Sequence, residues 1–331
     1  MRCFVVIDVS ARTFDLVIRS EGKNLKATQY PQTSKGFESA IKVLKKKQPE
    51  RIVLESTGVY YLDLAVALAK AGLPVCVVNP RSAKHFADVL MEQTKTDARD
   101  AAMLAEYAER MVPRLWVPPK PELMALRDVG RQINRLIHAR TQAKNRLHAL
   151  GAKQDTWSLL IDDERDGIDQ LDRRIERLRE AALQLVRDSQ GLSRGLDQIL
   201  AAKGIGENSA IILLAELAVL PQDMKAKQVA RYAGLNVVTR QSGTSVRSPG
   251  RLSKAGNAYL RAALYMPAMT SIKHSPEAKA FRDRLVSNGK KPAQAVGALM
   301  RKYLTGVWAA LQSDTPFDPQ LLFSEKSTAK G

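Results

Sequence analysis

The sequence has few cysteines and no long apolar run. Its 331 residues include two cysteines, Cys3 and Cys76, both in stretches typical of buried strands. We expect reduced core thiols in a cytoplasmic protein, not a disulfide framework. No Cys/His cluster has zinc-ligand spacing. No apolar run approaches the roughly 18 residues of a membrane span, and the N-terminus enters a strand with no secretion leader.

Acidic residues are absent from a long part of the C-terminal half. No Asp or Glu occurs between Asp223 and Glu277, and the span from Lys225 to Lys302 holds sixteen Lys or Arg and two acids. That span carries most of the net charge of +18. Such a basic block indicates a polyanionic partner, most often nucleic acid. The alternative is a solvated basic surface without a specific partner, which the patterned apolar residues inside the block disfavour.

The N-terminal third alternates strands and helices. Its turn residues and apolar periods predict strands over 3–9, 13–20, 24–30, 51–55 and 73–78, and helices over 34–47, 60–71, 81–91 and 97–111. Three strands followed by alternating helices and strands predict an α/β layer with a mixed sheet. A group of prolines after residue 112 marks the end of this region.

Beyond those prolines the apolar period becomes that of a heptad. Apolar residues step by three and four from Leu126 to Leu150, and again from Ile168 to Leu185. Two such helices suit an antiparallel hairpin or a dimerising coiled coil, and the pattern does not decide between pairing within and between chains. We expect three parts: an α/β domain over 1–115, a coiled-coil region over 116–190, and a mainly helical domain over 191–331.

Four carboxylates in the first part form a pattern. Asp8 and Glu55 come late in strands that we expect to be neighbours, where ligands of α/β sheets gather. Asp97 and Asp100 share one face at the start of a helix. Separately, Asp8 could cap the turn toward Arg12, and acids at a helix start complement its dipole. Together they favour a site for hard divalent cations, which suits phosphodiester chemistry. The arrangement resembles the RNase H/RuvC-like nuclease fold.

The stretch 200–210 has the form of a helix-hairpin-helix. Gly204 and Gly206 permit a tight turn, and the amides that open the next helix can bind a phosphate. Lys203 adds a positive charge directly before them. A plain helix–helix turn is the alternative, but the acid-free basic surroundings favour contact with nucleic acid.

The stretch 239–257 is a Gly/Ser/Arg-rich interruption of the helical part. We expect a basic loop that contacts phosphates, through the four cations Arg240, Arg247, Arg251 and Lys254. Such a loop can also carry a nucleophilic serine held by nearby cations. Composition does not choose between Ser242, Ser245, Ser248 and Ser253, and a flexible loop without catalytic function is the alternative.

Several motifs in order resemble the DEDD insertion-sequence transposases of the IS-one-ten type. In the N-terminal part these are Ile7-Asp8, Glu55-Ser56-Thr57-Gly58, Asn79-Pro80 and the segment 95–100. In the C-terminal part they are 204–206, Tyr232-Ala233-Gly234-Leu235, Ser242-Gly243, 252–256 and 261–269. The resemblance covers about residues 3–320. One departure is Lys203, where the family often has proline.

The resemblance implies an activity. It implies a RuvC-like domain and a transposase domain joined by a coiled coil, recombining donor and target DNA under the guidance of a bridge RNA. The four acidic residues of the family fall on Asp8, Glu55, Asp97 and Asp100, which would hold Mg²⁺, and its nucleophilic serine falls on Ser242. The family acts as a dimer of dimers, so we expect a homodimer that assembles to a tetramer.

Two other interpretations remain open. A RuvC-like junction nuclease would use the same metal site with water as nucleophile and form no covalent link to DNA. A nucleic-acid-packaging protein would need neither the carboxylates nor the serine, although a pure binder gains nothing by holding acids near phosphate.

Overall fold

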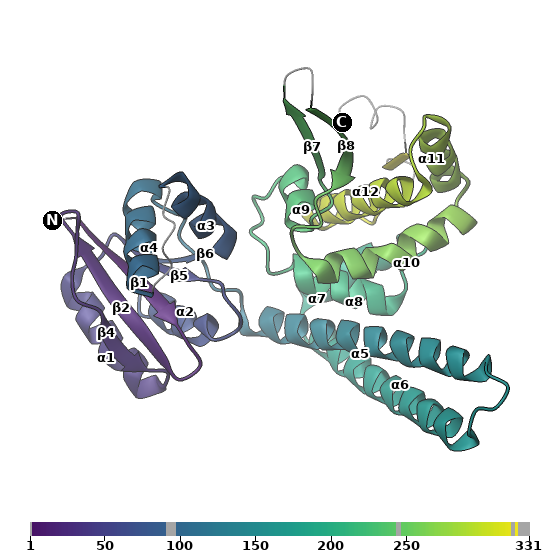
Figure 1. Cartoon of the computed structure of the whole chain (residues 1–331), viewed down its shortest axis with the longest axis horizontal. Coiled ribbons are helices and arrows are strands. Elements are labelled where there is room, and N and C mark those ends of the chain that lie inside the picture. Colours follow the sequence, from purple (N-terminus) through teal and green to yellow (C-terminus); the bar gives the residue numbers. More distant parts are fainter. Residues whose placement is uncertain (1, 91–96, 243–245, 319–321, 324–331) are drawn as a thin grey trace. The chain divides into compact units, whose positions relative to one another are not determined.

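The computed structural model describes residues 2–90, 97–242, 246–318 and 322–323. The chain divides into two compact units, Met1–Pro118 and Pro119–Gly331, which are described separately (Figure 1). Among the described helices, none has both the length and the apolar character needed to cross a bilayer.

The first unit is an α/β layer with a mixed sheet, as the sequence predicts. Its elements are β1 (Cys3–Val9), β2 (Thr13–Ser20), β3 (Lys23–Asn24), β4 (Thr28–Pro31), α1 (Ser34–Lys47), β5 (Arg51–Glu55), α2 (Tyr61–Lys70), β6 (Val75–Val78), α3 (Pro80–Val89) and α4 (Asp97–Met111). The sheet order is β3-β2-β1-β5-β6, with β4 also paired to β2. Strand β1 is antiparallel to β2 and parallel to β5, and β5 is parallel to β6.

The prediction of a single strand over 24–30 is wrong, because this stretch contains the two strands β3 and β4. Both β3 and β4 pair with β2, but Arg19 faces Asn24 while Leu16 faces Thr28, so the register shifts by one residue between them. One extra residue on the outer strand is the property of a β-bulge, which sequence periodicity does not locate.

Both faces of this sheet are buried. Successive side chains of a strand point to opposite faces, and in β1 the residues Val5 and Ile7 pack with α1 and α2 while Phe4 and Val6 pack with α4. Strands covered on both faces read as continuous apolar runs, which explains the run in β1. Both cysteines are buried and free, and burial raises the pKa of the Cys76 thiol to about 11.

The second unit is mainly helical. Its elements are α5 (Pro121–Gly151), α6 (Ser158–Arg187), α7 (Gln190–Leu200), α8 (Glu207–Leu217), α9 (Ala226–Tyr232), β7 (Val237–Ser242), β8 (Val246–Leu252), α10 (Ala258–His274), α11 (Pro276–Ser287) and α12 (Pro292–Ser313). Helices α5 and α6 lie side by side within one chain (Figure 1). Their buried residues share a core with the helices that follow them. Pairing of these heptads between chains stays a prediction.

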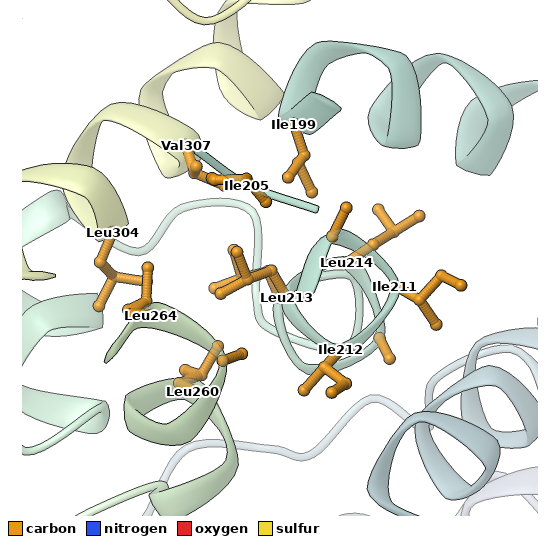
Figure 2. Close-up of a cluster of buried hydrophobic side chains, with 14 of the residues drawn as sticks. Ile199, Ile205, Ile211, Ile212, Leu213, Leu214, Leu260, Leu264, Leu304 and Val307 are labelled. Atoms are coloured by element: carbon orange, nitrogen blue, oxygen red, sulfur yellow. The ribbon is translucent and has the colours of Figure 1, made fainter. Parts of the chain in front are cut away.

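Helix α8 is the centre of this unit. Every residue from Ala210 to Leu217 is buried, and Figure 2 shows its isoleucines and leucines pointing in different directions toward the neighbouring helices. A helix that is apolar all round must be covered on all sides. Helices α5, α6, α7 and α10 supply that cover.

The Gly/Ser/Arg-rich stretch was expected to be a loop, and this prediction is wrong for most of its length. Strands β7 and β8 form an antiparallel hairpin, with a register irregularity between Val238 and Arg240. The β-branched residues Val237, Val238, Thr239 and Val246 favour extended backbone. The glycines and serines around these residues favour a loop, so the sequence analysis did not predict the strands. We call β7 and β8 the serine hairpin.

A short turn joins α7 to α8, and the helix-hairpin-helix assignment of this stretch stays a prediction. Gly204 has φ +94°, and a side chain there would also crowd the Pro267 carbonyl oxygen at 3.2 Å. Gly206 is the N-cap of α8. Contact of this turn with a phosphate stays a prediction.

The turn that returns the serine hairpin to α10 depends on Gly256. Its φ is +156°, and a Cβ there would lie 2.2 Å from the Tyr232 carbonyl oxygen. We expect Gly256→Ala to lower the free energy of unfolding of this unit by about 2 kcal/mol or more. The measurement is urea unfolding followed by the fluorescence of Trp308, the buried tryptophan of this unit, with the other two tryptophans replaced by phenylalanine.

The matched control is Gly191→Ala in α7. No atom lies within 4 Å of a Cβ at that position. Stability should stay unchanged or rise by up to about 1 kcal/mol, because alanine favours the helix. Equal stability of the two variants would contradict the role assigned to Gly256.

Candidate metal centre and serine hairpin

Two of the predicted carboxylates lie side by side in the sheet. The parallel register pairs Val6 with Val53 and Ile7 with Leu54. The next residue on each strand is acidic, Asp8 on β1 and Glu55 on β5. Continuing the same register by one residue therefore brings these two carboxylates into neighbouring positions.

Both carboxylates belong to the sheet face that α4 covers. Phe4 and Val6 on β1 and Val53 on β5 pack against Leu104 and its neighbours on α4. Asp8 and Glu55 follow these residues at the period of two that keeps one face. They lie where the buried part of this face ends, since Asp8 is exposed and Glu55 half-buried.

Helix α4 brings a third carboxylate to this face. Asp100 precedes Leu104 by four residues and therefore lies on the same side of the helix. It is half-buried. Asp97 is the first residue of α4, and its side chain lies outside the described part of the structure. Among the described side chains, no three of the types His, Cys, Asp and Glu stand close enough to hold one metal ion.

A further acid, which the sequence reasoning missed, faces Asp8 across the sheet. Asp15 on β2 is the direct partner of Asp8 in the antiparallel register. It lies between Phe14 and Leu16, which face α1 and α2, so its own side chain is on the α4 side. The Gln29 amide donates to its carboxylate at 3.2 Å. Like charges directly opposite are destabilising, and the Gln29 amide offsets part of that cost on Asp15.

The donor set suits a hard divalent cation in its chemistry, and its members share one face of the sheet, but the described carboxylates do not form a three-ligand cluster. Carboxylate oxygens are the ligands that Mg²⁺ prefers, and two adjacent strands supply two of them. The turn after β1 is held by the Ser10 hydroxyl, which donates to the Thr13 carbonyl oxygen at 2.7 Å. Asp8 lies within the strand before that turn, opposite Asp15.

Of the four candidate serines, Ser242 stands at the end of β7, where its backbone pairs with Val246. The Ser253 hydroxyl donates to the Asn236 side chain at 2.8 Å and accepts from the Ala255 amide. These bonds give Ser253 a structural role at the base of the serine hairpin. Ser245 and the side chains of Ser242 and Ser248 lie outside the described part.

The predicted nucleic-acid contacts lie on two elements. Arg240 and Arg247 are near-opposite positions on β7 and β8, since Gln241 pairs with Arg247; their side chains lie outside the described part. Arg251 and Lys254 are exposed at the base of the hairpin. Lys203 lies in the α7–α8 turn, where its carbonyl oxygen accepts from the Tyr303 hydroxyl at 3.1 Å.

A buried carboxylate joins the hairpin base to the long helix α5. Glu216 on α8 is fully buried. Arg131 on α5 donates to both of its oxygens, and the Asn257 amide donates to Oε2 at 2.6 Å. Asn257 also caps α10, accepting from the Leu260 amide. The arginine itself lies 4.9 Å from the ring centroid of Tyr259, a cation–π contact.

The sequence analysis did not predict this hydrogen-bond network, although the position of Glu216 in the sequence indicates that it needs a partner. A single acid inside the apolar segment 210–217 is costly to bury unless it is paired. The sequence does not say that the partners come from α5 and from the residue after the hairpin, because those contacts span 85 and 41 residues of chain.

Comparison with protein families gives two matches. Residues 5–150 match a family model described as a transposase, and residues 196–283 match the model of the IS116/IS110/IS902 transposase family. The pilin gene-inverting protein of Moraxella bovis is 28% identical over 97% of this chain and 99% of its own. That of Moraxella lacunata is 30% identical over 82% of each chain. An IS110 protein of Streptomyces coelicolor is 24% identical over 82% of this chain and 83% of its own.

Among solved structures, Thermus thermophilus RuvC in complex with a Holliday junction substrate aligns with 34% of this chain and 96% of its own. The identity is 16% and the TM-score 0.26.

The buried network yields a stability prediction. Glu216→Leu leaves the half-buried Arg131 guanidinium without its carboxylate, and we expect a loss of about 3–5 kcal/mol in the free energy of unfolding of the second unit. In the same variant, backbone amide hydrogen exchange at residues 253–257 should be faster than in the wild type. The control Glu176→Leu removes an exposed i,i+3 partner of Arg179. Unchanged exchange in Glu216→Leu would contradict the anchoring role.

Proposed function

This chain belongs to the IS116/IS110/IS902 family of transposases, and we propose that it cuts, exchanges and rejoins DNA strands for an insertion sequence in the cytoplasm. The relatives named for inverting a pilin gene support a reaction that rearranges DNA. The observation that supports the proposal is the parallel register that pairs Ile7 with Leu54, the residues directly before Asp8 and Glu55.

The carboxylates are the proposed metal ligands. Asp8, Glu55 and Asp100 from the described face, together with Asp97, would hold divalent cations, with Mg²⁺ the expected ion. When bound, such ions supply charge stabilisation to a phosphate that is being cut. Asp8 and Glu55 come from neighbouring strands and Asp100 from the helix that covers them, so the packed layer supports the positions of these three.

Ser242 is the proposed nucleophile. Its hydroxyl oxygen would attack the phosphorus, forming a phosphoserine link while one phosphorus–oxygen bond of the DNA breaks. The departing oxygen takes a proton and becomes a free hydroxyl end. Attack by a hydroxyl end of the exchanged strand reverses the step, releases Ser242 and conserves the phosphodiester energy. Ser242 is the last residue of β7, and the basic residues Arg240, Arg247 and Arg251 of the same hairpin would bring a DNA strand to it.

The basic residues would hold the nucleic acid. Arg240, Arg247, Arg251 and Lys254 on the hairpin, and Lys203 with the Gly204 and Gly206 amides on the α7–α8 turn, are the proposed phosphate contacts. We further propose that a bridge RNA pairs with donor and target DNA, and that a homodimer assembles to a tetramer in which one subunit's carboxylates act with another's serine.

The second candidate function is a junction nuclease that uses water. The same register of Asp8 and Glu55 favours it, because a metal site alone suffices for hydrolysis. The two functions differ at Ser242, which only the transposase mechanism requires.

A cleavage assay tests the carboxylates. Asp8→Asn or Glu55→Gln should lower strand cleavage of element-end DNA by roughly 100-fold or more, because one ligand charge is lost at the reacting phosphate. EDTA should have the same effect on the wild type. The assay measures nicked product on denaturing gels, with purified protein and the RNA transcribed from the flanks of its gene.

The matched control is Asp15→Asn, which removes a carboxylate from the same face without touching the four proposed ligands. Cleavage should change by less than about tenfold there. If Glu55→Gln cleaves as well as Asp15→Asn does, the metal site is not at these residues.

A trapping experiment tests the serine. DNA cut by the wild type should migrate with the protein after denaturation, and mass spectrometry should place the link at Ser242. Ser242→Ala should give neither adduct nor recombinant product, whereas the control Ser253→Ala, directly after the hairpin, should still form the adduct. Undiminished cleavage without an adduct in Ser242→Ala would favour the water-dependent nuclease.

A further inference from the structure

A pocket of about 700 Å³ lies at the base of the serine hairpin. Its walls come from Val237 on β7, from Leu252 on β8, and from helices α9, α11 and α12. Small-molecule sites typically occupy roughly 300–1,000 Å³. We call it the hairpin pocket; none of the sites described above uses it.

The hairpin pocket combines apolar walls with a basic rim. Leu235, Leu252, Phe281 and Leu285 contribute apolar surface. The cations that line it are Lys227, Arg284, Lys290, Arg301 and Lys302. Among the described lining residues, none is acidic. Five positive charges around an apolar hollow are complementary to a ligand with a flat apolar part and a negative group.

The cations gather around one aromatic ring. The Lys302 ammonium lies 5.0 Å from the Phe281 ring centroid, and the Arg284 guanidinium carbon lies 5.6 Å from it. Burial, and then the Arg284 charge, lower the pKa of Lys302. The Lys302 ammonium also donates to the Leu322 carbonyl oxygen at 2.7 Å. Two positive charges beside one ring favour an anionic ligand.

The pocket walls are close-packed and so are formed before any ligand arrives. A Cβ at Gly297 on α12 would lie 2.5 Å from Leu252 Cδ1, and one at Gly250 would lie 2.7 Å from Val237 Cγ1. The Gln294 amide donates to the Gly250 carbonyl oxygen at 3.2 Å and ties α12 to the hairpin. A preformed pocket loses little entropy on binding.

We propose that the hairpin pocket binds one unpaired nucleotide, with its base against the apolar walls and Phe281 and its phosphate on Arg284 and Arg301. A base can lie on such a surface only when it has left a duplex stack. Aromatic and guanidinium planes are the usual partners of unstacked bases. The inference rests on the proposed function in one respect, that nucleic acid is the partner. A DNA strand near the break and a guide-RNA loop would present the same chemistry.

Fluorescence of 2-aminopurine tests the proposal on the full-length protein. A 12-nucleotide single strand with one internal 2-aminopurine is titrated with protein in EDTA, so that no cleavage occurs. Saturable binding with a fluorescence change is expected, and the same strand annealed to its complement should show at most a fifth of that change. A DNA and an RNA version, compared directly, identify which of the two sources binds more tightly.

Variants locate the site. Arg284→Gln and Arg301→Gln should each weaken single-strand binding at least fivefold, whereas the control Lys279→Gln, an exposed cation of the same helix α11 outside the pocket, should change it less than twofold. Ala298→Leu fills the pocket without changing charge. It should abolish the fluorescence change while the dependence of binding on salt persists. Thermal melting checks that each variant folds.

Some results would overturn the inference: equal binding by Arg301→Gln and Lys279→Gln, an unchanged fluorescence response in Ala298→Leu, or no response in the wild type. The proposed function is tested separately, because Glu55→Gln and Ser242→Ala should retain the full response. If the wild-type protein gives no 2-aminopurine fluorescence change but cleaves DNA, the proposal for the hairpin pocket is wrong and the proposed function is not affected. If the fluorescence change is present and Glu55→Gln cleaves DNA as well as the wild type does, the proposed metal site is wrong and the proposal for the hairpin pocket is not affected.

Discussion

The parallel pairing of β1 with β5 is the constraint on which the first unit depends. The pairing sets Val6 beside Val53 and Ile7 beside Leu54, and the acids that follow become neighbours. Side chains alternate between faces, so a slip of one residue would move Glu55 to the opposite face. The slip would also change which side chains meet in the two close-packed cores on either face of the sheet. The hydrophobic core therefore specifies the positions of the two carboxylates.

In the second unit a buried ion pair has the corresponding role. Helix α8 is covered on all sides, and Glu216 can be buried there because Arg131 and Asn257 saturate it. Breaking such a pair costs far more than an exposed pair gains. The base of the serine hairpin is thus tied to α5 by charge and to α12 by the tight Gly297–Leu252 contact. A rigid base under the hairpin is what a positioned nucleophile would require.

Much of the first unit could be predicted from the sequence, because its strands and helices have strong local periods. The bulge between β3 and β4 could not, since it depends on pairing with β2. The serine hairpin was missed because glycines and serines interrupt its β-branched residues, such as Val237 and Val246, and are equal to them in number. Asp15 was missed for another reason: only the register shows that it faces Asp8. The hairpin pocket has no local signal at all, since its walls come from five elements.

Direct metal binding tests the central claim, that Asp8 and Glu55 share a divalent cation. Mn²⁺ can replace Mg²⁺ at carboxylate sites, and the electron paramagnetic resonance signal of free Mn²⁺ falls when the ion binds. Titration of the full-length protein without DNA should show binding that the double variant Asp8→Asn/Glu55→Gln weakens by roughly tenfold or more. Asp15→Asn should bind almost as the wild type does. Equal Mn²⁺ affinity of the wild type and the double variant would contradict the account.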